Sequence, residues 1–155
     1  MIFTLTLIAA LGSGLVAGTF FAFSTFVMKS LARLPAREGI AAMQSINHVI
    51  LGSLFMPVFF GTAALSILAL IVAFLRWHEP GAVYLLTGGL FYLVGSFMAT
   101  VVFNVPLNVA LDSAKPADCA SATLWAGYVR NWTRWNHVRT VASLAAAAAF
   151  TLALG

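Results

Sequence analysis

One segment of this 155-residue chain, residues 125–139, gathers most of the side chains that can do polar chemistry beside a flat, apolar molecule. It reads WAGYVRNWTRWNHVR and contains three Trp, one Tyr, two Asn, one His and three Arg. At about 100° per residue, the aromatic side chains share one helical face with Asn136 and Arg139. The opposite face carries Arg130, Arg134 and His137. The sequence therefore predicts an amphipathic helix whose aromatic stripe becomes polar at Asn136 and Arg139.

Two interpretations of this helix are open from the sequence. In the first, it forms an interfacial belt, in which Trp and Tyr lie at the depth of the lipid headgroups and Arg contacts lipid phosphate. In the second, Asn136 and Arg139 belong to a site inside the protein. The belt accounts well for the basic face. It accounts less well for an asparagine and an arginine that share a face with the aromatic residues.

Further polar side chains occur at the ends of two other apolar segments. Gln44, Asn47 and His48 come just before one apolar run, and Asn104 and Asn108 follow another. The last two are four residues apart and share a face if the helix continues through them. Because polar groups at membrane depth are costly unless they pair or meet water, we expect all of these groups to converge. Trp132, Trp135, Met43 and Phe103 are the predicted walls of the resulting site.

The composition is that of an integral membrane protein. Hydrophobic residues make up 62% of the chain and charged residues only 8%, whereas soluble domains carry about 25% charged residues. Four apolar segments are long enough to cross a bilayer as helices. They cover residues 2–28, 49–75, 82–103 and 136–154. We therefore predict a single all-α transmembrane domain over residues 1–155, an integral membrane four-helix up-down bundle.

Prolines and small residues refine this prediction. A helix that starts near Arg37 should lead directly into the second span, where Pro57 predicts a kink. Pro106 removes one backbone donor and frees a carbonyl in the third segment. Residues 121–139 form the amphipathic aromatic segment that extends the fourth helix into the cytoplasm. Gly14 and Gly18 form a GxxxG pair, which is typical of closely packed membrane helices.

Basic residues predict the orientation of a multi-pass protein in the cell inner membrane. Seven of the eight lie in the first and third connections, and one lies in the second. By the positive-inside rule, the first and third connections face the cytoplasm and both termini are extracytoplasmic. The net charge of +4 belongs to the loops. It indicates contact with anionic lipid headgroups rather than with nucleic acid.

Several kinds of site lack their sequence signatures. The three histidines show no metal-binding spacing, and Cys119 is the only cysteine, so we predict no metal. No P-loop, GxGxxG motif or Ser-His-Asp set is present, and we predict no cofactor. All four acidic residues fall in predicted loops, which argues against the carboxylate relays of proton-coupled transporters. Any chemistry therefore falls to asparagine, histidine, arginine and aromatic residues.

Three short motifs give the chain a resemblance to a known family. They are AMQSIN at residues 42–47, FNVPLN at residues 103–108 and WTRWNHVRT at residues 132–140, the last preceded by Trp125 and Tyr128. With these motifs the sequence resembles, over nearly its whole length, the anthrone oxygenase-like family of small bacterial and fungal integral membrane proteins. The NVPLN element and the pattern of two Trp, Asn and Arg are the most specific parts of the resemblance.

The resemblance implies four transmembrane helices. For characterised members it implies oxidation of polyketide anthrones to anthraquinones with dioxygen, without a metal or flavin. The matched positions are the implied site: Asn47, Asn104, Asn108, Trp132, Trp135, Asn136 and Arg139. An anthrone has an acidic methylene, and its enolate reacts with dioxygen directly. A site for this reaction needs a base, donors for the enolate oxygen and a flat aromatic slot.

Residue types and the resemblance together suggest a role for each candidate. His48 is the candidate base. The candidate donors that stabilise the developing oxyanion are Asn104, Asn136 and Arg139. The candidate substrate-binding residues are Asn47, Asn108, Trp132 and Trp135, of which the two Trp rings can stack on fused rings.

Each candidate also has a plainer interpretation. The asparagines can bond to one another and fix the register of the helices. Arg139 can reach lipid phosphate, with its stem lying along apolar surface. His48 can be an ordinary interfacial histidine. These alternatives stay open at the level of sequence.

Three functions are open from the sequence. The first is an oxygenase-like membrane enzyme, a monooxygenase that acts on a flat, apolar phenolic or anthrone-like substrate. The second is a non-catalytic membrane protein that binds a lipid or another hydrophobic small molecule. The third is a structural partner subunit, and the small-residue helices are also compatible with a homo-oligomer. Dioxygen consumption would favour the first, a bound lipid without turnover the second, and an apolar patch covered only in a complex the third.

Overall fold

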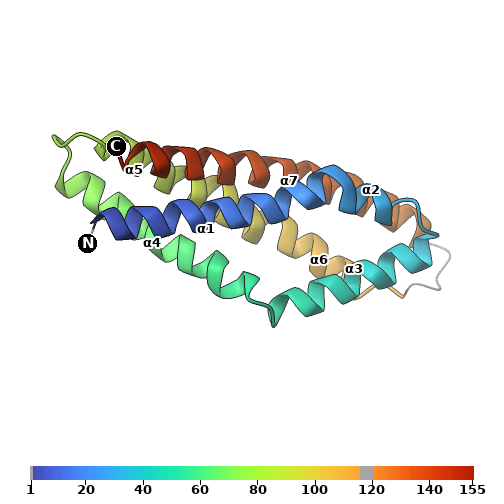
Figure 1. The fold of residues 1–155 in the computed structure, drawn as a ribbon. Helices are drawn as coiled ribbons and strands as arrows, with labels where there is room; N and C mark the ends of the chain where they lie inside the picture. Colours follow the sequence, from blue (N-terminus) through green and yellow to red (C-terminus); the bar gives the residue numbers. More distant parts are fainter. Residues whose placement is uncertain (1, 116–120) are drawn as a thin grey trace.

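A computed structural model describes residues 2–115 and 121–155 of the chain, and within them every regular element is helical. The predicted all-α class is therefore confirmed. In chain order the elements are α1 (Ile2–Ala22), the π-helical η1 (Phe23–Val27), α2 (Met28–Leu31), α3 (Ala36–Leu51), α4 (Phe55–Leu75), α5 (Ala82–Leu90), the π-helical η2 (Phe91–Met98) and η3 (Thr100–Asn104), α6 (Val105–Asp112) and α7 (Ser121–Leu152) (Figure 1).

Three helical stretches are long and apolar enough to cross a membrane. They are Ile2–Leu31, which joins α1, η1 and α2, Phe55–Leu75, which is α4, and Ala82–Asp112, which joins α5 through α6. These lengths and compositions indicate a membrane protein. Helix α7 has 32 residues but is less apolar, since Asn136, His137 and Arg139 fall in its middle.

The helices run lengthwise through an elongated molecule, as Figure 1 shows. Both termini lie at the end that holds the turn between α4 and α5. The turn between α2 and α3, the end of α6 and the start of α7 lie at the opposite end. This second end carries the basic first connection and the aromatic part of α7, so the residues singled out in the sequence gather there.

The prediction of one helix leading through residues 49–75 is wrong. Helix α3 ends at Leu51 and α4 begins at Phe55. In the turn between them, the Ser53 hydroxyl accepts a hydrogen bond from the Phe55 backbone N–H at 3.2 Å and so helps to cap α4. Pro57 lies in the first turn of α4. The first four N–H groups of a helix have no intrahelical acceptor, so a proline there needs no kink.

We call the stretch Ile2–Leu31 the first helix and the stretch Ala82–Asp112 the third helix; the latter is not the element α3. The third helix extends further than predicted. It continues to Asp112 instead of ending at residue 103. The π-helical turn η3 lies just before Pro106, and there the Val105 N–H donates to the Thr100 carbonyl. This wider turn is a local adjustment of the kind that lets a proline stay inside a helix. As a result, Asn104, Asn108 and Asp112, each four residues apart, belong to one continuous helix.

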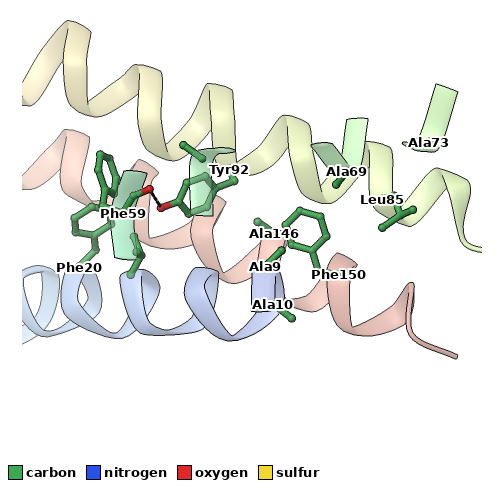
Figure 2. Packing of buried hydrophobic residues seen from close by; sticks show 12 residues of the cluster. Ala9, Ala10, Phe20, Phe59, Ala69, Ala73, Leu85, Tyr92, Ala146 and Phe150 are labelled. Atoms are coloured by element: carbon green, nitrogen blue, oxygen red, sulfur yellow. Dashed lines mark hydrogen bonds between the residues drawn. The ribbon is translucent and has the colours of Figure 1, made fainter. Parts of the chain in front are cut away.

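The core of the end near the termini is built from aromatic and small residues (Figure 2). The Tyr92 hydroxyl donates to the Phe59 carbonyl at 3.0 Å, which satisfies both groups inside the helix cluster. Ala9, Ala69 and Ala146 are fully buried. Small side chains let helix backbones approach closely, which is how helices gain packing energy in a membrane.

Glycines mark which helix faces meet and which face outward. A Cβ at Gly95 would overlap the Cβ of Ala142 on α7. By contrast, a Cβ at Gly14 or Gly18 would meet no atom of the described residues within 4 Å. The GxxxG pair therefore does not pack against another helix of the described chain, and the prediction of a homo-oligomer stays a prediction.

This difference provides a matched test of packing. We expect Gly95→Ala to destabilise the protein by about 1–3 kcal/mol, the usual cost of overfilling a close contact. The control, Gly14→Ala, should unfold at or above the parent's temperature, since alanine favours a helix over glycine. Thermal unfolding in detergent, followed by tryptophan fluorescence, measures both. Equal unfolding temperatures for the two variants would contradict the packing of α7 against the third helix.

A second apolar cluster occupies the opposite end of the molecule. Its buried members come from α2, α3, α6 and α7, and they are Met28, Ile40, Met43, Leu111, Trp125, Tyr128 and Trp132. Three members of the predicted aromatic stripe are thus buried inside the protein. The interfacial-belt interpretation does not hold for them. These three side chains pack α7 against α3 and α6. This packing positions the site described next.

Candidate functional site

A cavity of about 290 Å³ lies where the two apolar clusters meet. Residues from five parts of the chain line it: Thr19, Phe20 and Phe23 of the first helix; Met43, Ile46, Asn47, His48, Ile50 and Leu51 of α3; Phe55, Met56 and Phe59 of α4; Thr100, Val105, Asn108, Val109 and Asp112 of the third helix; Trp132 and Arg139 of α7. The lining is mainly apolar with a few polar groups, which is the usual character of a small-molecule site.

Aromatic rings form much of the wall. Phe20 meets the rings of Phe55 and Phe59 edge-on, with centroids 5.9 and 6.3 Å apart. Phe23 packs against Trp132 at 5.6 Å. These rings come from α1, η1, α4 and α7, and together they present the flat apolar surfaces that a fused-ring molecule can contact.

Arg139 is the charged group of this wall. It is only 4% exposed, and its guanidinium carbon lies 4.1 Å from the centroid of the Phe20 ring and 5.0 Å from that of Trp132. One terminal nitrogen donates to the Thr100 hydroxyl at 3.2 Å, and the other donates to Asn136 Oδ1 at 2.6 Å. The guanidinium is therefore held in place by two helices and two aromatic faces.

The charge of Arg139 has no acidic partner among the described residues. The two ion pairs in this part of the chain are His48–Asp112 and Arg76–Glu79. The Nε atom of Arg139 is buried without a hydrogen-bond partner in the described structure. A buried cation in this state is costly. Arg139 thus lines an apolar cavity with a charge and a donor that an anionic ligand would satisfy.

Asn136 positions Arg139 and does not line the cavity. Its Nδ2 donates to the Phe20 carbonyl and to the Ser24 hydroxyl, both at 2.7 Å, and its Oδ1 accepts from Arg139. All of these bonds are buried. Because both amide hydrogens are engaged, the predicted role of Asn136 as a donor to an oxyanion needs revision. It ties α7 to the first helix and fixes the guanidinium.

The two asparagines of the third helix also bond to α7. The amide nitrogen of Asn104, which is fully buried, donates to the Trp132 carbonyl at 3.3 Å, and its oxygen has no partner in the described structure. The Asn108 oxygen accepts from the Tyr128 hydroxyl at 2.8 Å and from Trp132 Nε1 at 2.9 Å. Burial raises the pKa of Tyr128, so its hydroxyl stays protonated and donates. Asn108 lines the cavity, whereas Asn104 does not.

His48 lies at the rim of the cavity and bonds to an acid. Its Nε2 is 2.8 Å from Asp112 Oδ1, and both side chains are exposed. A carboxylate accepts, so this bond places a proton on Nε2 and leaves Nδ1 of the neutral ring as an acceptor. One turn earlier in α3, Gln44 donates to the Leu111 and Ala114 carbonyls at 2.9 and 3.1 Å. Together these bonds hold α3 against the end of α6.

The remaining predicted site residues have different placements. Asn47 lines the cavity, and its amide nitrogen is buried without a partner in the described structure. Trp135 stacks in parallel on Phe103 with centroids 3.4 Å apart, and neither residue lines the cavity. The structure thus brings five of the eight predicted residues to the cavity: Asn47, His48, Asn108, Trp132 and Arg139. Phe103, predicted as a wall, is not part of it.

Sequence reasoning missed the phenylalanines of the wall, Phe20, Phe23, Phe55 and Phe59, and it missed three polar residues that hold other site residues in place. Thr100 accepts from Arg139, Tyr128 orients Asn108, and Asp112 orients His48. From the sequence, Asp112 is expected in a loop, because the predicted third span ends at residue 103. The available signal was its spacing, four residues after Asn108 and eight after Asn104. No group of three His, Cys, Asp or Glu side chains that could hold a metal ion occurs in residues 2–115 and 121–155.

A comparison with protein families gives one finding that bears on function. A family model described as anthrone oxygenase matches residues 51–149, which is more than half of the chain. The matched region contains Asp112 and six of the eight predicted site residues, while Asn47 and His48 precede it. No curated protein and no solved structure matches the chain.

Proposed function

Because this chain belongs to the anthrone oxygenase family, we propose that it is a membrane-embedded monooxygenase for a flat, apolar, anthrone-like or phenolic substrate. The cavity that Arg139 lines is the proposed site. One observation carries the proposal: a buried guanidinium without an acidic partner in the described structure lies on the wall of an aromatic cavity. An enolate or phenolate bound there would supply the missing negative charge.

Arg139 is suited to the oxyanion for electrostatic reasons. Fixed donors in a site that excludes water stabilise developing charge far more than they do in bulk solvent. Thr100 and Asn136 already hold the terminal nitrogens, so the guanidinium needs little rearrangement when charge develops on the substrate. Phe20 and Trp132 line the cavity beside the guanidinium, so a fused-ring substrate bound there would contact the parts of their rings that Arg139 does not cover.

His48 is the proposed base, with Asp112 as its positioning residue. The bond between Nε2 and Asp112 leaves Nδ1 to take a proton from the methylene of the substrate. The same carboxylate oxygen, 2.8 Å from Nε2, fixes the orientation of the ring. Both residues line the same cavity as Arg139.

The proposed reaction balances with dioxygen as the only co-substrate. A proton leaves the methylene carbon for His48, and the resulting enolate gives electrons to dioxygen as a C–O bond forms. The peroxide anion that results takes the first proton back from His48. The hydroperoxide then loses water as its O–O bond breaks and the second methylene proton leaves. One oxygen atom remains as the new carbonyl, the other leaves as water, and the carbon is oxidised by four electrons. The substrate supplies all four electrons, two from the enolate and two from the second C–H bond, so the proposal requires no metal or flavin.

The residues at the rim of the cavity are consistent with an apolar substrate that enters from the membrane. Leu51, Val105 and Val109 line the cavity and are exposed on the outside of the molecule. On the polar side of the rim lies the His48–Asp112 pair. A fused-ring substrate dissolved in lipid therefore meets an apolar edge first and the base next.

We also propose that α7 is a fourth membrane span in an up-down bundle in the inner membrane, with both termini extracytoplasmic. The contacts of Asn136 with Phe20 and of Arg139 with Thr100 support this proposal, because they keep these two polar residues of its middle inside the protein, whereas His137 is exposed. The basic residues of the first connection and of residues 121–139 then lie together on the cytoplasmic side.

Cysteine labelling in cells tests this orientation. In a Cys119→Ser background, a membrane-impermeant thiol reagent added outside should label His78→Cys and leave Ser30→Cys unlabelled until the cells are opened. Both positions are exposed. Labelling of Ser30→Cys alone in intact cells would reverse the proposed orientation.

Turnover tests the proposed activity. Purified protein in detergent should consume one dioxygen for each anthraquinone formed from an anthrone, faster than the same mixture with heat-denatured protein. Absorbance of the quinone and an oxygen electrode measure both quantities. A protein that binds flat tricyclic phenols but consumes no dioxygen with any of them would instead support the non-catalytic binding function.

A further inference from the structure

A second hollow lies outside the proposed active site, between α2 and α7, and its volume is about 340 Å³. Its floor is apolar and includes Met28 and Val129. Around this floor lie four basic side chains: Lys29, Arg130, Arg134 and His137. We call this hollow the basic groove. All four basic residues are exposed, so they are accessible to a ligand at the surface.

The charge of the basic groove is not balanced by the protein in the described structure. No acidic residue lines it, and none of its four basic residues takes part in the two ion pairs of residues 2–115 and 121–155. The Thr133 hydroxyl, which also lines the groove, is buried without a partner in the same part of the chain. Arginine forks and a hydroxyl are suited to the oxygens of a phosphate group.

The chemistry changes along the same face of α7. Arg134 and His137 are followed, at helical spacing, by Val141 and Leu144, which are both exposed. The face therefore runs from cationic to apolar over about two turns. On the neighbouring helix, Lys29 lies near the end of the candidate span Ile2–Leu31. A ligand that follows this face needs an anionic head and an apolar tail.

We propose that the basic groove binds an anionic phospholipid, with its phosphodiester headgroup among Lys29, Arg130 and Arg134 and one acyl chain along Val141 and Leu144. The charges attract the headgroup, and basic pockets between helices at the cytoplasmic side suit such lipids. The apolar stretch next to the charges selects a lipid over free phosphate. This site is independent of the proposed oxygenase activity, because the groove and the cavity share no lining residue.

Lipid titration with charge-matched variants tests the proposal. The probes are dioctanoyl phosphatidylglycerol and dioctanoyl phosphatidylcholine, added to the purified protein in detergent and counted on it by native mass spectrometry. The test variant is Arg130→Ala/Arg134→Ala. The control is Arg33→Ala/Arg37→Ala, which removes the same charge from exposed positions of the first connection that do not line the groove.

The parent should bind one phosphatidylglycerol at least about tenfold more tightly than phosphatidylcholine, and the test variant should lose this preference, given the gain expected for two basic residues near an anionic headgroup. The control should keep it. An equal loss in both variants would show diffuse attraction and overturn the site. Displacement of the lipid by an equal concentration of inorganic phosphate would overturn the role of the apolar stretch, and no preference in the parent would overturn the whole proposal.

Discussion

Arg139→Met is expected to reduce the oxidation of an anthrone by about a hundredfold or more, the usual effect of removing a donor to a developing oxyanion. The change removes the only Arg or Lys side chain that lines the cavity among the described residues. Methionine fills a similar apolar volume and relieves the cost of a buried charge without an acidic partner, so the fold should persist. Dioxygen uptake with purified, folded protein measures the rate.

Two further variants separate charge from geometry. Arg139→Lys keeps the cation but loses the fork that bonds to Thr100 and Asn136 at once, so its rate should lie between those of the parent and Arg139→Met. The matched control is Arg33→Ala, which removes an exposed cation from the first connection and should leave the rate unchanged. Full activity in Arg139→Met would show that the buried guanidinium has no part in the reaction.

His48→Gln is expected to have an effect of similar size, since a positioned general base contributes about 10²–10⁴-fold to a rate. Asp112→Asn should also slow the reaction, because an amide can donate to Nε2 and thereby favour the proton on Nδ1, where the base must be free. Both side chains are exposed, so the fold should tolerate the changes. Glu79→Gln, in the exposed pair with Arg76 at the other end of the molecule, is the matched control.

Proton exchange shows whether these effects belong to the base. Without dioxygen, the parent should exchange the methylene protons of an anthrone for deuterium, because enolate formation precedes oxygen chemistry. His48→Gln should lose this exchange, whereas the Glu79 control should retain it. If His48→Gln exchanges protons at the parent's rate, then another group is the base and the assignment to His48 is wrong.

The sequence contains enough information for the helical class and for the link between Asn136 and Arg139. These two residues are three apart on one face of a helix without a break, and side chains at that spacing meet. Their burial does not follow from the sequence alone: a polar pair within an apolar segment is costly in lipid, but Arg139 could also reach lipid phosphate along an apolar surface. The structure places this pair against Phe20 and Thr100. The predicted convergence of all the polar groups is observed only in part, because Gln44, Asn104 and Asn136 do not line the cavity.

The ends of α3, α4 and the third helix could not be predicted from the sequence, because an apolar stretch gives little local signal for where a helix begins or ends. The break between α3 and α4 falls in the run LGSLF, whose hydrophobicity continues that of the span. Its Ser53 cap is a weak local signal. The end of the third span was missed in the opposite direction: it was predicted at residue 103, but the π-helical turn before Pro106 lets the helix continue to Asp112. The pairing of His48 with Asp112 depends on both of these corrections.

Which helix face meets which neighbour is a further property that periodicity does not determine. Trp132 and Trp135 are three residues apart, and both were expected at the site. In the structure Trp132 is buried over the cavity, while Trp135 stacks on Phe103 away from it. The difference arises from the third helix, where the Asn108 side-chain oxygen accepts a hydrogen bond from the Trp132 indole N–H. Tertiary contacts of this kind separate a core residue from its neighbour on the same stripe.

The position of a bound ligand tests the central claim most directly. An experimental structure of the protein with a hydroxyanthraquinone, a flat tricycle that resembles the proposed product and does not react further, should show the ligand in the cavity between α3 and α7. One of its oxygens should lie within hydrogen-bond distance of Arg139, and its rings should lie against Phe20 or Trp132. A lipid chain in that cavity, with the quinone bound elsewhere or not at all, would contradict the proposed active site.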